Sequence, residues 1–246
     1  MHALLSTYPE KRCGICYTFG MSITSDTPQR DSFSYRNLFS PEHRFSLLGA
    51  LAFMGIAYVA EHFANVYAFT YSTRPTSRYV GDLILDNLQV VDLSFIIVEC
   101  ALLAIVLGTV FVLQRPRYIL FTLKALALFI IIRAFFISLT HVGIYPEHIA
   151  PGFGVFDGIY SYLNFQMGLF FSGHTGMPFL MALIFWEQKR ARLVFLSLSL
   201  VFAIAVLLSH VHYSIDVFAA PFMAYGIFHI AKYFFPRDYN LVAAAP

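Results

Sequence analysis

The stretch V-D-L-S-F-I-I-V-E-C-A-L-L-A-I-V-L-G-T-V-F-V-L, residues 91–113, decides the class of fold. It contains no Lys or Arg, lacks the alternation typical of a strand, and is longer than an ordinary strand. About 20 apolar residues cross the hydrocarbon core of a bilayer as a helix. Lipid offers no partner for the open N–H and C=O groups of an irregular backbone. The stretch therefore predicts a transmembrane helix.

The composition of the whole chain agrees with this interpretation. Its 246 residues are 59% hydrophobic and only 12% charged, and 27 of them are Phe. Soluble domains carry about 25% charged residues, and disordered chains combine low hydrophobicity with high charge. A soluble globule and a disordered chain are both excluded. The net charge of +2 gives no argument for binding to nucleic acid.

Five further stretches resemble the first in length and character, so we expect an all-α polytopic membrane protein, a bundle of six transmembrane helices. We expect a polar tail without a cleavable signal before this domain and a short tail after it. The predicted spans are residues 45–68, 91–113, 118–140, 168–187, 191–210 and 213–234, within a domain 45–234 flanked by tails 1–44 and 235–246.

The distribution of Lys and Arg predicts how the bundle is oriented. Twelve of the 16 basic residues lie in the two tails and in the second-to-third and fourth-to-fifth connections. The opposite connections hold only Arg74 and Arg78. Because cytoplasmic segments carry the excess of positive charge, both termini are expected in the cytoplasm. The two remaining basic residues, Lys124 and Arg133, lie inside the third span, and we expect Lys124 to extend toward the inner interface.

Charged side chains inside spans are costly and often mark function. Glu61, Glu99 and Arg133 are expected in the outer half of the membrane. They form either a buried ion pair, with one glutamate neutralising Arg133, or part of a site. Asp82 lies in the first outer connection, near Asp86 and Asp92, and such residues are expected to be solvated or to cap helix ends.

Two short motifs carry the densest chemistry. In F-F-S-G-H-T-G, residues 170–176, Ser172 is a predicted N-cap, Gly173 allows close approach of a ligand, and the helix start favours an anion. In S-H-V-H-Y-S-I-D-V, residues 209–217, His212 and Asp216 are four apart and share one helix face. A descent through one span and a return through the next bring both motifs to the same side.

Together, His174, His212, Asp216 and Arg133 are the residue types that phosphoryl transfer requires. One imidazole, oriented by Asp216, can attack phosphorus while the other donates a proton to the leaving oxygen. Arg offers paired donors to phosphate oxygens. Two other interpretations remain open, namely histidines that cap helix ends at the interface and a zinc site. The outer side lacks Cys and a third closely spaced ligand for zinc, and the pair Cys13 and Cys16 stands alone in the polar tail.

These motifs resemble the type 2 phosphatidic acid phosphatase superfamily, and most closely its sphingomyelin synthase branch. S-G-H-T at 172–175 follows an aromatic residue as in that branch, and H-Y-S-I-D-V at 212–217 carries Ser for Thr. Arg133, followed by six residues and then Thr140, matches an upstream element of the same branch. The proline-rich acidic element near the branch's second span is not matched, and residues 166–168 depart from its C-G-D, which leaves head group and acceptor open.

The resemblance implies a mechanism without metal or cofactor. His212 would attack phosphorus, oriented by Asp216; His174 would be the general acid and base; Arg133, Ser172 and the Gly173 N–H would bind phosphate oxygens. Thr140, Thr175 and Glu99 are possible supporting residues. The donor would be a phospholipid, and the acceptor a lipid alcohol (diacylglycerol or ceramide) in a transferase or water in a phosphatase.

The aromatic connection 141–167 is expected either to gate lipid entry or to pack over the bundle. A non-catalytic lipid-binding protein or transporter is the alternative from another class.

Overall fold

The computed structural model describes residues 33–74, 77–149 and 169–243. The polar tail up to residue 32, with Cys13 and Cys16, and residues 150–168 of the aromatic connection lie outside the described residues. The described part is helical and contains no strand, which confirms the predicted all-α class. Its elements are α1 Tyr35–Leu38, α2 Arg44–Ser72, the 3₁₀ turn η1 Leu85–Asn87, the π-helical turn η2 Ile96–Cys100, α3 Ala101–Leu113, the 3₁₀ turn η3 Pro116–Tyr118, α4 Ile119–Leu139, α6 Gly173–Ile184, α7 Lys189–Leu208, α8 Ser214–Phe234 and α9 Pro236–Ala243.

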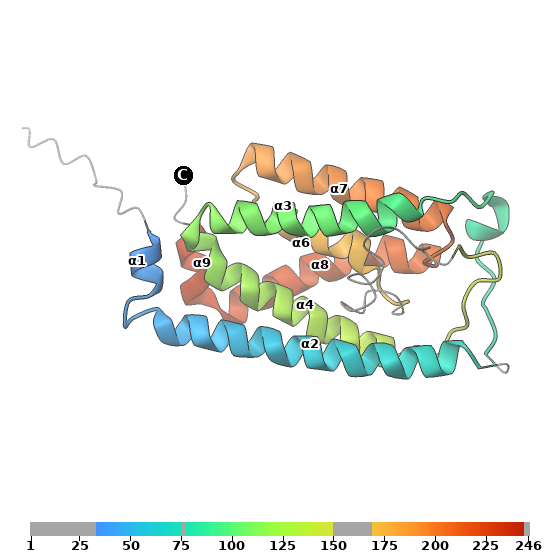
Figure 1. Cartoon of the computed structure of the whole chain (residues 1–246), viewed down its shortest axis with the longest axis horizontal. Helices are drawn as coiled ribbons and strands as arrows, with labels where there is room; N and C mark the ends of the chain where they lie inside the picture. Colours follow the sequence, from blue (N-terminus) through green and yellow to red (C-terminus); the bar gives the residue numbers. More distant parts are fainter. Residues whose placement is uncertain (1–32, 75–76, 150–168, 244–246) are drawn as a thin grey trace, which may run out of the picture. The chain divides into compact units, whose positions relative to one another are not determined.

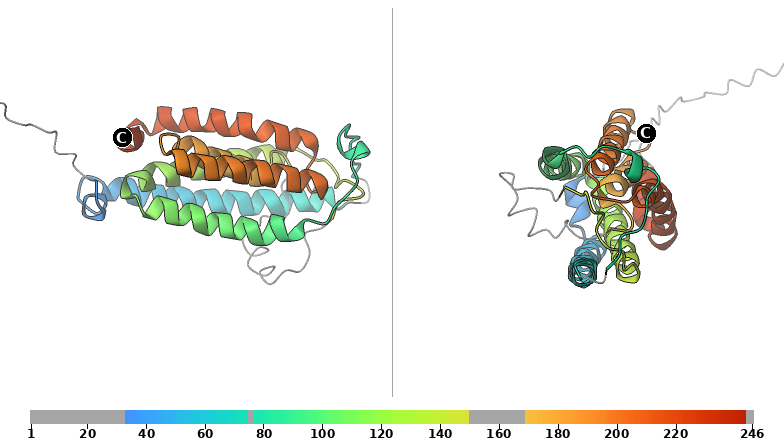
Figure 2. Two further views of the ribbon diagram at one scale, coloured as in Figure 1. Left: turned by 90° about the horizontal axis from the view of Figure 1, so that it is seen from above. Right: turned by 90° about the vertical axis from the view of Figure 1, so that its right-hand side faces the viewer.

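Within residues 33–243 the long helices run side by side along one axis (Figures 1 and 2). α4, α6 and α8 form the core, where α6 packs between α7 and α8 and α4 packs against α2. α4 is half buried along its length, whereas only 17% of the apolar window of α2 is buried. α2 therefore presents most of its surface to the surroundings of the bundle, which for a chain of this composition is lipid.

Among the residues that the structure describes, five helices are long and apolar enough to span a membrane, in agreement with five of the six predicted spans. The fourth predicted span, residues 168–187, differs, because its described helix α6 has only 12 residues. At 1.5 Å per residue, α6 is about 12 Å shorter than the 20-residue helix α7 beside it. Non-helical backbone is tolerated at membrane depth where protein surrounds it, and the Ser172 N–H donates to the Asp216 carbonyl of α8 at 3.0 Å.

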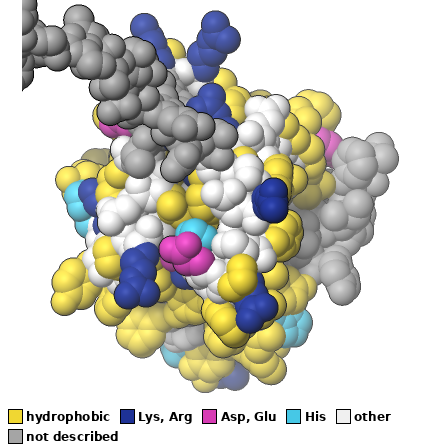
Figure 3. All heavy atoms as spheres, turned by 90° about the vertical axis from the view of Figure 1, so that its left-hand side faces the viewer, with side chains coloured by type: hydrophobic (Ala, Val, Ile, Leu, Met, Phe, Trp, Pro, Cys, Tyr) yellow, Lys and Arg dark blue, Asp and Glu magenta, His cyan; other side chains and the backbone are white. Residues whose placement is uncertain are grey.

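The two ends of the bundle differ in charge. The end where α2, α4 and α7 begin, which we call the basic end, carries Lys and Arg side chains scattered over its face (Figure 3). The opposite end, where α6 and α8 begin, is called the site end below. This separation is the charge asymmetry that the sequence predicts. The described basic residues at the helix termini and connections of the basic end are Arg36, Arg44, Arg115, Arg117, Lys189, Arg190, Arg192, Lys232 and Arg237.

The C-terminal segment forms α9 and packs against α4 and α8 instead of remaining an extended tail. Asp238 of α9 is buried and accepts hydrogen bonds from the Lys124 ammonium and from the Ser46 hydroxyl, the latter at 2.9 Å. Lys124 therefore carries its charge to the basic end, as its position in the third span predicts, and pairs it there with a carboxylate.

Candidate functional site

The start of α6 presents the first histidine motif. The Ser172 hydroxyl accepts the N–H of Thr175 at 3.4 Å, which confirms the predicted N-cap. Gly173 and His174 form the first turn, where backbone N–H groups lie before the first intrahelical acceptor. Ser172 is fully buried, and its N–H is bound to the first turn of α8.

The start of α8 presents the second motif. Asp216, in the first turn, accepts the N–H of Tyr213 at 3.1 Å and closes the helix start as a capping box. His212 stands just before this cap. Its Nδ1 lies 2.9 Å from the Leu169 carbonyl oxygen and 3.5 Å from Asp216 Oδ2. The side chains of His212 and Asp216 are both nearly completely buried.

The two motifs meet. The ring centroids of His174 and His212 lie 6.3 Å apart, with 67° between the ring planes. The backbone hydrogen bond from Ser172 to Asp216 links the two helix starts directly. Two imidazoles, one beside a buried carboxylate, therefore adjoin the N-terminus of a helix, and this is a site suited to an anionic group.

Residues 168–233 match the family PAP2_C, described as PAP2 superfamily C-terminal. The matched segment contains both histidine motifs and helices α6 and α7 with nearly all of α8. The match makes residues 168–233 similar to the C-terminal part of PAP2 superfamily proteins. No match to the chain is found among curated proteins or among solved structures.

Arg133 of α4 lies against the PAP2 segment. Its Nε donates to the Phe171 carbonyl at 2.9 Å, and a side chain added at Gly173 would come within 3.4 Å of the same nitrogen. Its Nη1 pairs with Glu61 of α2. The buried ion pair considered for Arg133 is thus present, with Glu61 and not Glu99 as the carboxylate. The same arginine also holds its positive charge at the start of α6.

Three predicted supporting residues have different surroundings. Thr140 ends α4, and its hydroxyl donates to the Phe136 carbonyl at 2.9 Å. Glu99, in η2, is partly buried and forms no ion pair with the Lys and Arg side chains that the structure describes. Thr175 is buried beside the site, and its carbonyl accepts the Ser199 hydroxyl of α7 at 2.8 Å. Thr175 directly follows His174 in the chain.

The connection between α2 and η2 holds the PAP2 segment in place. Asp82 of this connection is buried; its Oδ2 accepts the N–H of Ser214 at 2.7 Å, and its Oδ1 accepts the N–H of Ile84 at 3.0 Å. Burial raises the pKa of Asp82, but the hydrogen bonds from Ser214, Leu85 and Ile84 outweigh it and hold the pKa below the usual value. Asp82 is thus a capping group, one of the two roles expected for it.

Hydrogen bonds of two tyrosine hydroxyl groups attach a second connection, residues 140–149, to the first connection and to the start of α8. The Tyr213 hydroxyl donates to the Gly143 carbonyl at 2.8 Å. The Tyr145 hydroxyl donates to Asp86 Oδ1 at 2.7 Å, and this hydrogen bond, together with burial, raises the pKa of Tyr145 to about 12. Residues 140–149 and 77–92 are therefore tied both to each other and to the start of α8.

Sequence reasoning missed the Leu169 carbonyl as the close partner of His212. Any residue supplies a carbonyl, so no sequence signal points to it. It also missed the link from Asp82 to Ser214, although the acidic run from residue 82 marks the region. Within the described residues, no group of three or more His, Cys, Asp or Glu side chains has the arrangement of a metal site.

Proposed function

We propose that the chain is a membrane lipid phosphotransferase of the sphingomyelin synthase type, with His212 as nucleophile and His174 as general acid and base. One observation carries the proposal: His212 Nδ1 lies 2.9 Å from the Leu169 carbonyl. A carbonyl oxygen only accepts hydrogen bonds, so Nδ1 bears the proton. In neutral imidazole the lone pair then remains on Nε2, the nitrogen that attacks.

In the first half-reaction, Nε2 of His212 forms a bond to phosphorus. The bond from phosphorus to the leaving oxygen breaks, and that oxygen takes its electron pair together with a proton from His174. A phosphohistidine results on His212. The Asp216 carboxylate stabilises the positive charge that develops on the imidazole as it attacks.

In the second half-reaction, the acceptor hydroxyl gives its proton to His174 and its oxygen bonds to phosphorus. The phosphorus–nitrogen bond breaks, and the electron pair returns to Nε2. A lipid alcohol, diacylglycerol or ceramide, gives transfer of the phospho-alcohol head group. Water gives hydrolysis, as in a lipid phosphate phosphatase.

The remaining site residues act on the phosphoryl oxygens. Arg133 lies against Gly173, so its positive charge acts on an anion at the start of α6. The Gly173 N–H and the α6 helix start add preorganised dipoles, and Ser172 keeps the turn in place. Such donors contribute most where charge develops in the transition state.

The topology belongs to the same proposal. Six spans with both termini in the cytoplasm bring the basic end to the cytoplasmic face, as the positive-inside rule requires. The site end then lies on the extracytoplasmic side. The 12-residue α6 counts as the fourth span because the bundle surrounds the backbone at its start.

The test uses the purified chain in vesicles with phosphatidylcholine or phosphatidic acid labelled in the head group. Addition of diacylglycerol or ceramide should yield a newly labelled lipid, and release of water-soluble label without acceptor would assign hydrolysis instead. His212→Gln should remove both, whereas His229→Gln, at an exposed position of α8, should remove neither. Wild-type protein that binds phospholipid and never turns it over would overturn the proposal in favour of a non-catalytic lipid-binding role.

A further inference from the structure

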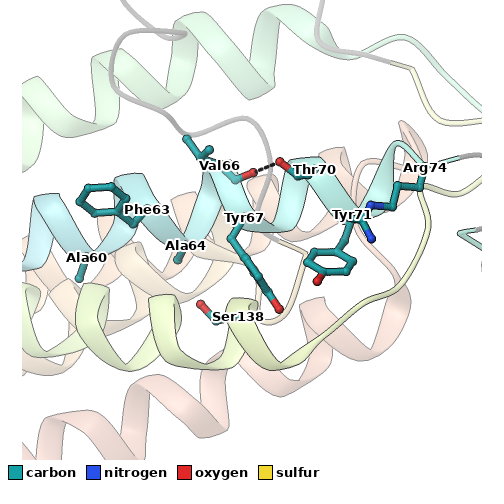
Figure 4. A pocket seen from close by; sticks show the side chains of 9 residues that line it. All are labelled: Ala60, Phe63, Ala64, Val66, Tyr67, Thr70, Tyr71, Arg74 and Ser138. Atoms are coloured by element: carbon teal, nitrogen blue, oxygen red, sulfur yellow. Dashed lines mark hydrogen bonds between the residues drawn. The ribbon is translucent and has the colours of Figure 1, made fainter.

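A shallow groove of about 720 Å³ runs along the surface of α2, and Ser138 of α4 also lines it (Figure 4). The floor of the groove includes the small side chain of Ala64, which is only 5% exposed. Its walls are apolar and strongly exposed, with Phe63 at 68% and Val66 at 50%. From Ala60 to Arg74 the lining extends about 20 Å at 1.5 Å per residue. One leaflet contributes about half of the 30 Å hydrocarbon core, so the groove has the length of one lipid chain with part of its head group.

The end of the groove nearest the site end is aromatic and cationic. The Arg74 guanidinium lies 4.1 Å above the Tyr71 ring. The Tyr71 ring also stacks on His141, with 4.0 Å between the ring centroids and 12° between the planes. The Tyr67 hydroxyl lies 3.1 Å from His141 Nε2 and fixes that ring in turn. The stack of imidazole, phenol and guanidinium therefore holds the arginine in place before any ligand arrives.

Arg74 has no carboxylate partner among the residues that the structure describes. A guanidinium held at the end of an apolar groove lacks a counter-charge, and a phosphate provides one with paired acceptors. The apolar walls require a ligand that also has a hydrocarbon part. A phospholipid has both a hydrocarbon chain and a phosphate. They follow one another in the same order as the apolar walls and the guanidinium of the groove.

We propose that this groove is a binding site for one anionic phospholipid of the leaflet at the site end. The acyl chain lies along Phe63, Ala64 and Val66, and the phosphate lies at Arg74. None of the residues that line the groove belongs to the two histidine motifs, so the proposal goes beyond the function proposed above and does not depend on turnover.

The experiment uses the full chain in nanodiscs with phosphatidylglycerol that carries a diazirine on one acyl chain. After illumination, mass spectrometry of peptides should locate most cross-links within residues 60–71. Arg74→Gln should lower their yield several-fold, whereas Arg78→Gln, the other basic side chain of this connection, should not. Diacylglycerol with the same diazirine lacks the phosphate and should be insensitive to Arg74→Gln.

Ala64→Phe fills the floor and should reduce labelling by both lipids, provided that its thermal unfolding matches the wild type. If that variant does not fold, Arg74→Gln alone decides the matter, because Arg74 is exposed. Equal yields in wild type and Arg74→Gln would overturn the proposal. Cross-links spread evenly over exposed positions of other helices, such as Leu103 and Leu200, or cross-links between two copies of α2, would overturn it as well.

Discussion

The carboxylate of Asp82 caps a helix that begins 132 residues later in the chain: its Oδ2 accepts the N–H of Ser214 at 2.7 Å. Ser214 is the first residue of α8, and His212 stands two residues before it. The connection after α2 thus controls the position of the proposed nucleophile from outside the PAP2 segment. A family match confined to residues 168–233 does not include this support.

Asp82→Asn should lower the thermal unfolding temperature, by the equivalent of about 1–3 kcal/mol, because the amide nitrogen that replaces one carboxylate oxygen cannot accept a backbone N–H. The effect should depend on pH. The pKa of Asp82 in the folded chain lies below 3.8, its usual value. The stabilisation is therefore complete above that value and is lost as pH falls through the folded pKa. In unfolding measured from pH 7 to pH 3, the difference between wild type and variant should be constant at neutral pH and begin to narrow below pH 3.8. Glu147→Gln, at an exposed position, is the control, and parallel curves across the whole range would contradict the assignment.

His212→Gln should abolish phosphate transfer and the covalent intermediate together, since it removes the nucleophile. His174→Gln removes the proton donor and should slow turnover by about 10²–10⁴-fold. The intermediate is measured as label on the protein that survives alkali and is lost in acid, as expected for a phosphorus–nitrogen bond. Label that persists on the His212→Gln protein would assign the nucleophile to another residue.

Glu61→Ala should destabilise the bundle by about 3 kcal/mol, because it leaves the buried Arg133 without its carboxylate. The double variant Glu61→Ala with Arg133→Ala should lose less than the sum of the single losses, with a coupling above about 1 kcal/mol. Denaturant titration in detergent measures all four forms. Additive losses would mean that the pair does not act as a unit, and Glu187→Ala, at an exposed position, should change little.

Gly176→Ala should cost about 1–3 kcal/mol of stability through overpacking. A Cβ at this position would lie 2.9 Å from Cζ of Phe129, a fully buried ring of α4. Gly226→Ala in α8 meets nothing within 4 Å and should be neutral or stabilising by up to about 1 kcal/mol. Thermal unfolding of the two variants side by side tests the packing of α4 on α6. Equal unfolding temperatures of the two variants would contradict this prediction, because they would show that the core adjusts to a methyl group at Gly176.

Most of the fold follows from the sequence because hydrophobic length alone selects a membrane helix. Five predicted spans coincide with long helices of the structure. The shortness of α6 was not predicted, because the hydropathy of residues 168–187 does not reveal that the described residues 169–172 are non-helical. That backbone is stabilised by a hydrogen bond to Asp216, 44 residues away in the chain.

The sequence by itself determined the chemistry available to this protein: two histidines, an aspartate four residues from one of them, and a buried arginine, all assigned to the same half of the bundle. Local spacing and helix periodicity suffice for that. Only the tertiary structure decided which partners these groups have, because carbonyl and carboxylate acceptors come from segments distant in the chain. Leu169 orients His212, Glu61 neutralises Arg133, and Asp82 caps α8. Each of these contacts depends on the packing of helices against one another, a property that no single segment encodes.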